Sequence, residues 1–390
     1  MRAFLRNNWP SLAALAVAVV SLVALPFAAA LAVIALVCLV SIVRLRTPLA
    51  RNAALSTAAV LLGLAGIEFG LYLLEPRGQE VDAARTQVPH DWYPYDPVVQ
   101  YKLRPSTTVK ARATYEGQLL YDVTYTIDAE GARVTPGSVD SGPTYIVMGD
   151  SYAFAEGVND DQTSASQFAQ RLKPPAHVVN FGVPGWGATH QVRAMELGLF
   201  DKAVVGKVAA VIVWVTPPHL ERVTGDASWL GNAPRYDFGP DGKLHHAGTF
   251  WEYRWTHPLA ALGYFARRHF RFVRRLTNEA MEREQAKLYV ALNARLKELV
   301  EQRYHAPLVL LSNGPEPSPP DSPDQPDLQY LPAFDGLRAI GAPVISVRKL
   351  LGPPAGWDKY FIPHDGHPTP LMNRMVGEAM ANYFSSQRRE

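Results

Sequence analysis

The first 76 residues contain two long apolar stretches. Ser11 to Val43 is a run of 33 residues without a charged side chain, and residues 52–74 contain a single charged residue, Glu68. One helix of that first length would measure about 50 Å, well beyond the roughly 30 Å of a bilayer's hydrocarbon core. We therefore expect a membrane region over residues 1–76 with three spans, at about residues 11–25, 27–43 and 53–74.

Basic residues indicate how these spans are oriented. Arg2 and Arg6 precede the first stretch, and three arginines follow it between residues 44 and 51. Because arginine near a span favours the cytoplasmic side, both groups share a side only if the first two spans form a hairpin. The third span then exports the remainder of the chain. A cleaved signal peptide ending near residues 28–30 is the alternative.

The polar stretch that follows, residues 77–142, changes character part-way along. Its beginning is rich in polar residues and proline, which is typical of a linker. The segment QLLYDVTYTID, residues 118–128, then alternates β-branched and aromatic residues with polar ones, and a turn sequence follows it. This period of two predicts a small β module or hairpin.

From residue 143 onward, continuous apolar segments alternate with amphipathic ones. The apolar segments predict five strands, at residues 144–148, 177–181, 208–215, 307–312 and 342–347. The amphipathic segments predict helices at residues 162–172, 189–200, 278–304 and 370–384. This order indicates an α/β fold with a parallel sheet covered on both faces. An insert at about residues 220–276, rich in arginine and aromatic residues, interrupts the order.

Composition excludes several classes of protein. The chain is 48% hydrophobic and 19% charged, against a usual charged fraction of about a quarter. A wholly soluble protein, a disordered chain and a coiled-coil rod are excluded, and a net charge of +2 gives no basic field for nucleic acid. The single cysteine, Cys38, forms no intramolecular disulfide. The histidines lack metal-protease spacing, so we expect no catalytic metal and no cofactor.

Chemically active residues follow the predicted strands. The first strand is followed by Gly149-Asp150-Ser151, the second by GVPGWG at residues 182–187, and the third by TPPH at residues 216–219. The segment HDGHP, residues 364–368, precedes the last helix. The carboxyl ends of parallel strands meet at one edge of the sheet, where functional residues gather. A serine, a histidine and an aspartate there suit nucleophilic catalysis.

Three of these segments resemble the SGNH or GDSL hydrolase superfamily. They read VMGDSYAFAEGV, NFGVPGWG and DGHPTPLMNRMVGEAM, occur in the family's order, and span about residues 144–384. The sequences around the first two segments are similar to those of a membrane-anchored bacterial subgroup. The resemblance implies a flavodoxin-like three-layer sandwich with a five-stranded parallel sheet over residues 143–390. It also implies ester hydrolysis or acyl transfer.

The resemblance assigns roles to individual residues. It makes Ser151 the nucleophile, His367 the base and Asp365 the residue that orients the base. The backbone N–H groups of Ser151 and Gly185 would form the oxyanion hole. The third strand ends in VTPPHLER without the family's asparagine, so His219 is the residue we expect to donate there. A helix cap, a loop histidine and a turn glycine are the structural alternatives for these positions.

Two functions follow. The first is a membrane-tethered serine esterase or O-acyltransferase that acts on an acylated cell-envelope glycan or lipid. The second is a catalytically weak or inactive protein of the same fold that binds a glycan or a partner membrane protein. In either case we expect the chain in the bacterial inner membrane, with its main domain on the periplasmic or extracytoplasmic side.

Two further features have open interpretations. Glu68 lies inside the third predicted span. A carboxylate there has three interpretations: it belongs to a functional site, its side chain extends to the membrane interface, or it contacts another helix. Residues 258–275 combine five arginines with three phenylalanines. They could form an interfacial helix on anionic lipid, a groove for an acidic glycan, or a lid helix with solvated arginines.

Overall fold

The computed structural model describes residues 27–45, 47–74, 85–88, 92–316 and 328–387. The chain divides into two compact units. Unit 1 comprises Met1–Gln79 and His257–Ala280, and unit 2 comprises Glu80–Thr256 and Met281–Glu390. The second half of the predicted insert therefore groups with the N-terminal helices, whereas its first half belongs to the α/β unit.

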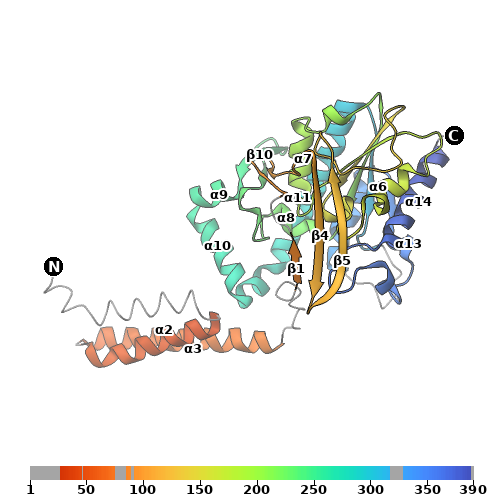
Figure 1. The fold of residues 1–390 in the computed structure, drawn as a ribbon. Helices are drawn as coiled ribbons and strands as arrows, with labels where there is room; N and C mark the ends of the chain where they lie inside the picture. The colour runs from red at the N-terminus through yellow and green to blue at the C-terminus, as the bar shows by residue number, and fades with distance from the viewer. Residues whose placement is uncertain (1–26, 46, 75–84, 89–91, 317–327, 388–390) are drawn as a thin grey trace. The chain divides into compact units, whose positions relative to one another are not determined.

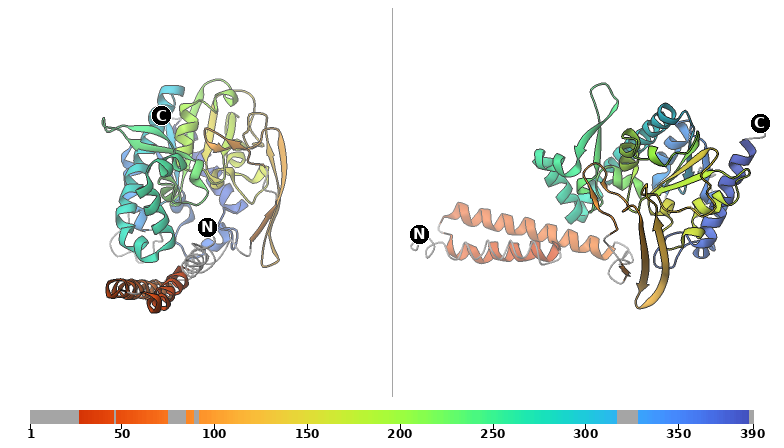
Figure 2. Two further views of the ribbon diagram at one scale, coloured as in Figure 1. Left: turned by 90° about the vertical axis from the view of Figure 1, so that its left-hand side faces the viewer. Right: turned by 45° about the horizontal axis from the view of Figure 1, so that its top comes forward.

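Unit 1 contains a helical hairpin. Helix α2, Phe27–Ser41, leads through a short 3₁₀ turn into helix α3, Pro48–Leu74, and the two helices lie side by side (Figures 1 and 2). Four of the five buried apolar residues described in these two helices are alanines, and such small side chains let helix backbones approach closely. In the described part of the chain, α3 is the one helix long and apolar enough to cross a membrane. The expected first span, residues 11–25, lies outside the described residues.

Unit 1 also contains helix α10, Pro258–His269, and the start of helix α11, Arg271–Tyr304. Proline at the first position of α10 suits a helix start, because its missing N–H would have no helical partner there. None of the side chains of α10 is buried. The side chains of this helix are therefore at most partly buried.

Unit 2 is built on a parallel sheet with the strand order β12-β11-β8-β6-β7. The strands are β6 Thr144–Gly149, β7 His177–Gly182, β8 Val208–Val215, β11 Leu308–Ser312 and β12 Val344–Ser346. Numbered along the chain, the order is 2-1-3-4-5, which is that of flavodoxin-like folds. The five predicted strands and the predicted fold class are confirmed.

Helices cover both faces of this sheet (Figure 1). In β6, Ile146 and Met148 face one core and Tyr145 and Val147 face the other, as the alternation of a strand requires. The first core receives α7 Ala188–Glu196, α12 Leu331–Ala339 and the unit 2 part of α11. The second receives α6 Ser164–Ala169, α13 Val347–Leu351 and α14 Pro370–Gln387. These are the three layers that the sequence predicted.

The expected β module is present in unit 2. Its long antiparallel strands β4 and β5 pair with each other, and β4 also pairs with β1. The bounds are β1 Arg85–Val88, β2 Tyr95–Asp96, β3 Gln100–Tyr101, β4 Thr107–Tyr115 and β5 Gln118–Ile127. Arg133 forms backbone bridges with both Ile127 and Asn180, so it connects this module to the end of β7.

The first half of the insert adds a hairpin and a helix to unit 2. They are β9 Pro234–Phe238, β10 Leu244–Thr249 and α9 Phe250–Thr256. The remaining short elements are 3₁₀ turns at Asp160–Gln162, Asp201–Ala203, Leu230–Asn232, Leu328–Tyr330 and Trp357–Tyr360.

Candidate active site

Ser151 lies at the first position of a short helix that follows β6. Helix α5, Ser151–Phe154, is capped by Asp150, whose Oδ1 accepts the Tyr152 N–H at 3.0 Å. Gly149 makes the turn possible: its φ is +155°, and an added Cβ would lie 2.8 Å from the Ala153 Cβ. The turn places Ser151, which is almost buried, at the carboxyl edge of the sheet.

His367 and Asp365 lie together in the loop before α14. Asp365 Oδ1 lies 2.5 Å from His367 Nδ1 and also accepts the His367 N–H at 3.2 Å. The Asp365 side chain is fully buried, while that of His367 is 14% exposed. A neutral imidazole that donates through Nδ1 keeps the lone pair of Nε2, which is the nitrogen a general base requires.

The serine helix and the histidine loop adjoin each other. The Tyr152 hydroxyl donates to the Gly366 carbonyl at 2.8 Å, and the Tyr152 and His367 rings lie 5.8 Å apart. Because Tyr152 directly follows Ser151, the structure brings the three expected catalytic residues onto neighbouring segments. His364, the other histidine of the loop, stacks instead on Tyr115 of β4, with ring centroids 4.2 Å apart.

Glu156 is a site residue that sequence reasoning missed. Its Oε2 lies 3.7 Å from His367 Nε2, and its side chain is 8% exposed. His367 therefore has a carboxylate near each ring nitrogen. The only sequence signal for Glu156 was its position five residues after Ser151, in the segment that resembles the family.

Gly185 lies in the loop between β7 and α7, at a φ of +82°. A Cβ at this position would collide with the Tyr101 hydroxyl. Tyr101 holds the loop on both sides: its hydroxyl donates to the Pro184 carbonyl at 3.0 Å, and its carbonyl accepts the Trp186 Nε1–H at 3.0 Å. Strand β3 of the β module thus fixes the loop expected to contribute to the oxyanion hole. No sequence pattern predicted this contact.

His190 supports the same loop from α7. Its Nδ1 accepts the Gly187 N–H at 3.2 Å, so the ring serves as a cap for the helix start. The side chain is fully buried, and burial together with the positive charges of Arg222 and His219 lowers the pKa of His190 to about 3. A neutral ring is required, because protonated Nδ1 could not accept this hydrogen bond.

His219 does not reach the site. It begins helix α8, His219–Val223, and is fully buried. Its Nε2 lies 3.0 Å from Asp150 Oδ2 and its Nδ1 lies 3.4 Å from the Tyr289 hydroxyl. Both ring nitrogens face protein groups, so His219 is not placed to donate to an oxyanion, which corrects the role expected from the sequence. Burial lowers the pKa of His219, although Asp150 opposes that shift.

Asp150 is the centre of a buried charge cluster. Its Oδ2 also accepts a hydrogen bond from Arg222 Nη1 at 2.9 Å, and the same Nη1 donates to the Trp186 carbonyl at 2.5 Å. Burial alone would raise the pKa of Asp150, but His219, Arg222 and the Tyr152 N–H outweigh it and hold the pKa well below its usual range. Arg222 therefore joins the serine turn to the glycine loop.

Thr216 is the first residue after β8. In the register of the sheet, Met148 pairs with Val213, so Ser151 and Thr216 each lie three residues beyond a paired position. Thr216 is 2% exposed, and its hydroxyl has no hydrogen-bond partner among the described residues. It lines a cavity of about 360 Å³ together with Tyr152. The signal was present in the sequence, because Thr216 opens the TPPH segment.

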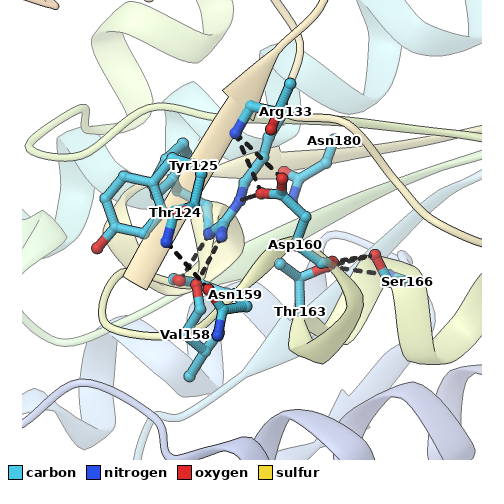
Figure 3. A network of polar contacts seen from close by, with 12 residues as sticks. Thr124, Tyr125, Arg133, Val158, Asn159, Asp160, Thr163, Ser166 and Asn180 are labelled. Carbon is cyan, nitrogen blue, oxygen red and sulfur yellow. Dashed lines mark hydrogen bonds and ion pairs between the residues drawn. The ribbon is translucent and has the colours of Figure 1, made fainter. Parts of the chain in front are cut away.

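Arg133 is buried within a network of polar contacts that includes Asp160 (Figure 3). Its Nη1 donates to the carbonyls of Phe154 at 2.6 Å and Ala155 at 2.7 Å, and its Nη2 donates to the Val158 carbonyl at 2.6 Å. Its Nε donates to Asp160 Oδ1 at 2.9 Å. One guanidinium therefore satisfies the carbonyls that end α5 and begin the next loop.

Asn180 has a structural position in the same region. Its Nδ2 donates to the Ala153 carbonyl at 2.9 Å and its Oδ1 accepts the Gly182 N–H at 2.9 Å. The first contact fastens α5 to β7, and the second lies within the end of β7 itself. In the described residues, no group of three His, Cys, Asp or Glu side chains converges as a metal site would require.

Comparisons with known proteins found similar folds. No protein-family model and no curated protein matches the sequence. Solved structures do match over 62–63% of this chain. One is a lipolytic protein of the G-D-S-L family from Desulfitobacterium hafniense, with a TM-score of 0.33, 12% identity and 99% of its own length covered.

Two other solved structures are similar to the same part of the chain. The lipase/acylhydrolase from Enterococcus faecalis has a TM-score of 0.34, 12% identity and 97% of its length covered. A mutant acetyl-xylooligosaccharide esterase from Geobacillus Stearmophilus has a TM-score of 0.35, 11% identity and 95% covered. The three neighbours are thus described as a G-D-S-L family lipolytic protein, a lipase/acylhydrolase and an esterase.

Proposed function

We propose that this chain is a membrane-tethered serine hydrolase of the SGNH or GDSL type that cleaves or transfers an acyl ester. The observation that carries the proposal is the Asp365–His367 pair, 2.5 Å apart, in a loop that adjoins the helix bearing Ser151. A buried carboxylate on Nδ1 orients the imidazole so that Nε2 can accept a proton, which is the arrangement that a general base requires.

In this mechanism Ser151 Oγ attacks the ester carbonyl, and its proton passes to His367 Nε2. Asp365 then stabilises the imidazolium through Nδ1, and Glu156 faces the same cation from the Nε2 side. The alkoxide of the substrate leaves with that proton as the acyl-enzyme forms. Water or a sugar hydroxyl next attacks the acyl-enzyme, with His367 as base again.

The tetrahedral oxyanion requires converging donors. We assign two of them to the backbone N–H groups of Ser151 and Gly185. The Thr216 hydroxyl is our candidate for the third. Its support is its place after β8, its burial and the lack of a hydrogen-bond acceptor for it among the described residues. A neutral hydroxyl donates as well as the side-chain amide that other family members use there.

The substrate we propose is an acylated glycan or lipid of the cell envelope. The cavity beside Tyr152 has aromatic walls, including Trp357 and Phe361, and polar groups from Asn313 and Arg348. Aromatic faces with a few polar groups suit a sugar ring that carries a short acyl group. Helix α3 would hold the enzyme at the inner membrane, with the α/β unit on the periplasmic side.

The test uses the full chain in detergent. A fluorophosphonate probe should label the protein, and p-nitrophenyl acetate should be hydrolysed, while Ser151→Ala should lose both signals. Adding a sugar acceptor separates transfer from hydrolysis by the product formed. An unlabelled, inactive wild type would contradict the proposal and favour a protein that binds a glycan or a membrane partner.

A further inference from the structure

Glu68 forms a helix cap inside unit 1. Its two carboxylate oxygens accept the backbone N–H groups of Arg271, at 3.1 Å, and Phe272, at 3.0 Å. These are the first two residues of α11, whose N–H groups have no partner within the helix. The Glu68 side chain is almost fully buried. Contact with another helix thus accounts for the carboxylate in the apolar stretch.

This cap sets the level of the α10–α11 junction along α3. Glu68 stands six residues before Leu74, the last residue of α3, which corresponds to about 9 Å along the helix axis. Just beyond Glu68, the Arg271 guanidinium lies 5.1 Å from the centroid of the Tyr72 ring. Tyrosine and arginine gather where a spanning helix leaves the hydrocarbon for the headgroups.

Helix α10 presents an apolar face at this level. Leu259, Leu262 and Phe265 recur every third residue, and they are 83%, 62% and 45% exposed. Leu276, in the first turns of α11, is 80% exposed. Exposed apolar side chains so grouped are typical of a surface that is covered in the working protein.

The same segment is strongly basic. It contains Arg267, Arg268, Arg271, Arg274 and Arg275 and, from residue 258 to residue 275, no acidic residue. A helix with an apolar face and adjacent arginines binds in the plane of an anionic membrane surface. An acidic glycan would use the arginines but would leave the leucines in water. A lid over a core would bury part of α10, and none of its residues is buried.

We infer that α10 and the α10–α11 junction form an interfacial element that lies on the anionic lipid surface of the membrane crossed by α3. The helix cap formed by Glu68 holds this element at the depth of the lipid headgroups. The leucines and Phe265 enter the acyl-chain boundary, and the arginines meet the lipid phosphates. The inference rests on the membrane tethering in the proposed function, but not on the proposed chemistry.

The experiment places a fluorescent label at one position of the full chain in lipid nanodiscs. The background carries Cys38→Ala, because Cys38 is the sole cysteine. Leu262→Cys reports α10, and Val60→Cys, an exposed position midway along α3, reports the span. Quenchers are attached to the lipid either near the headgroup or at the end of the acyl chain.

We expect the Leu262 label to be quenched by the shallow probe in discs with anionic lipid, and the Val60 label by the deep probe in every disc. One arginine near an anionic surface contributes about fivefold to such an equilibrium. Arg268→Glu should therefore reduce the docking equilibrium constant of the Leu262 label by at least that factor, as should zwitterionic lipid. Lys243→Glu, a similar charge change on an exposed turn of unit 2, should leave it unchanged.

Two outcomes overturn the inference separately from the tethering. If the Val60 label is quenched and the Leu262 label is not, α3 spans the membrane but α10 does not lie on it. Equal quenching of Leu262 in zwitterionic and anionic discs would refute the role of the arginines. An unquenched Val60 label would refute the tethering itself, whatever activity the α/β unit retains.

Discussion

Replacing Arg133 by alanine should destabilise unit 2 severely. The guanidinium is fully buried, pairs with Asp160 and donates to three backbone carbonyls (Figure 3). Its Cζ atom also lies 4.6 Å from the centroid of the Tyr125 ring and 4.5 Å from that of Phe154. Alanine removes the pairing, the donors and the stacking at once, and leaves a void among these groups.

The expected cost can be worked out from these contacts. Removing one partner of a buried ion pair costs about 3–5 kcal/mol. Asp160 is partly relieved, because its side chain is 17% exposed and still accepts the Thr126 N–H at 3.1 and 3.2 Å. The three carbonyls have no such relief, and a hydrogen bond to a charged donor contributes about 1.5–3 kcal/mol. We expect a loss of at least about 4 kcal/mol, against a usual total of about 5–15 kcal/mol.

Urea unfolding of the full chain in detergent measures this loss. Tryptophan fluorescence is a suitable probe, because the Trp92 ring lies 5.3 Å from that of Phe154. The matched control is Arg303→Ala, whose guanidinium pairs with Asp201 on the surface, at 33% and 44% exposure. Such a pair contributes less than about 1 kcal/mol. If Arg133→Ala costs no more than Arg303→Ala, the buried network does not hold the serine helix as we argue.

Four shorter predictions follow from the site and the chain. Asp365→Asn should lower kcat by about 10⁴-fold with KM little changed, because Asn favours the wrong tautomer of the base; unchanged turnover in a steady-state assay would remove Asp365 from the triad. Thr216→Val should lower kcat by about 10²–10³-fold while Thr216→Ser retains most activity, and equal rates for the two would exclude the hydroxyl as a donor. The pKa of His190 is about 3 in the folded state, whereas an unfolded histidine titrates near 6.5. The contribution of neutral His190 to the free energy of unfolding is therefore complete above about pH 6.5 and should fall by up to about 1.4 kcal/mol per pH unit below it. His190→Gln should flatten that slope in unfolding curves measured from pH 7 to pH 4. Alkaline phosphatase fused after Gly78 should be active, and a fusion between residues 46 and 51 should be silent; the reverse pattern would contradict the proposed topology.

The strands of the sheet could be predicted because their sequences leave little choice. Residues 208–215 are eight consecutive apolar residues, and they form β8 from Val208 to Val215. A strand buried on both faces requires such a run, so the pattern and the structure coincide. The serine turn, the glycine loop and the histidine loop could be placed for the same reason, since each follows or precedes one of these elements.

The environment of single side chains could not be predicted in this way. His219 stands where a catalytic donor was expected, yet Asp150 and Tyr289 enclose it. Nothing in the sequence marks Arg133 and Arg222 as buried, because arginine is usually exposed, and only the structure shows that their side chains are buried or nearly so. The grouping of α10 with the N-terminal helices could not be predicted either, because long-range contacts such as the cap formed by Glu68 are not marked in the sequence.

The attachment of the β module to the site limits how this protein can be divided or recombined. Tyr101 fixes the loop of Gly185, and Arg133 closes the end of the serine helix, although both residues precede the first strand of the parallel sheet. A gene fragment that begins at Thr144 would encode the whole five-stranded sheet and all three proposed catalytic residues, but neither of these supports. Residues 144–390 alone would therefore lack the groups that hold the serine turn and the glycine loop, and a fragment that keeps both supports must begin before Tyr101.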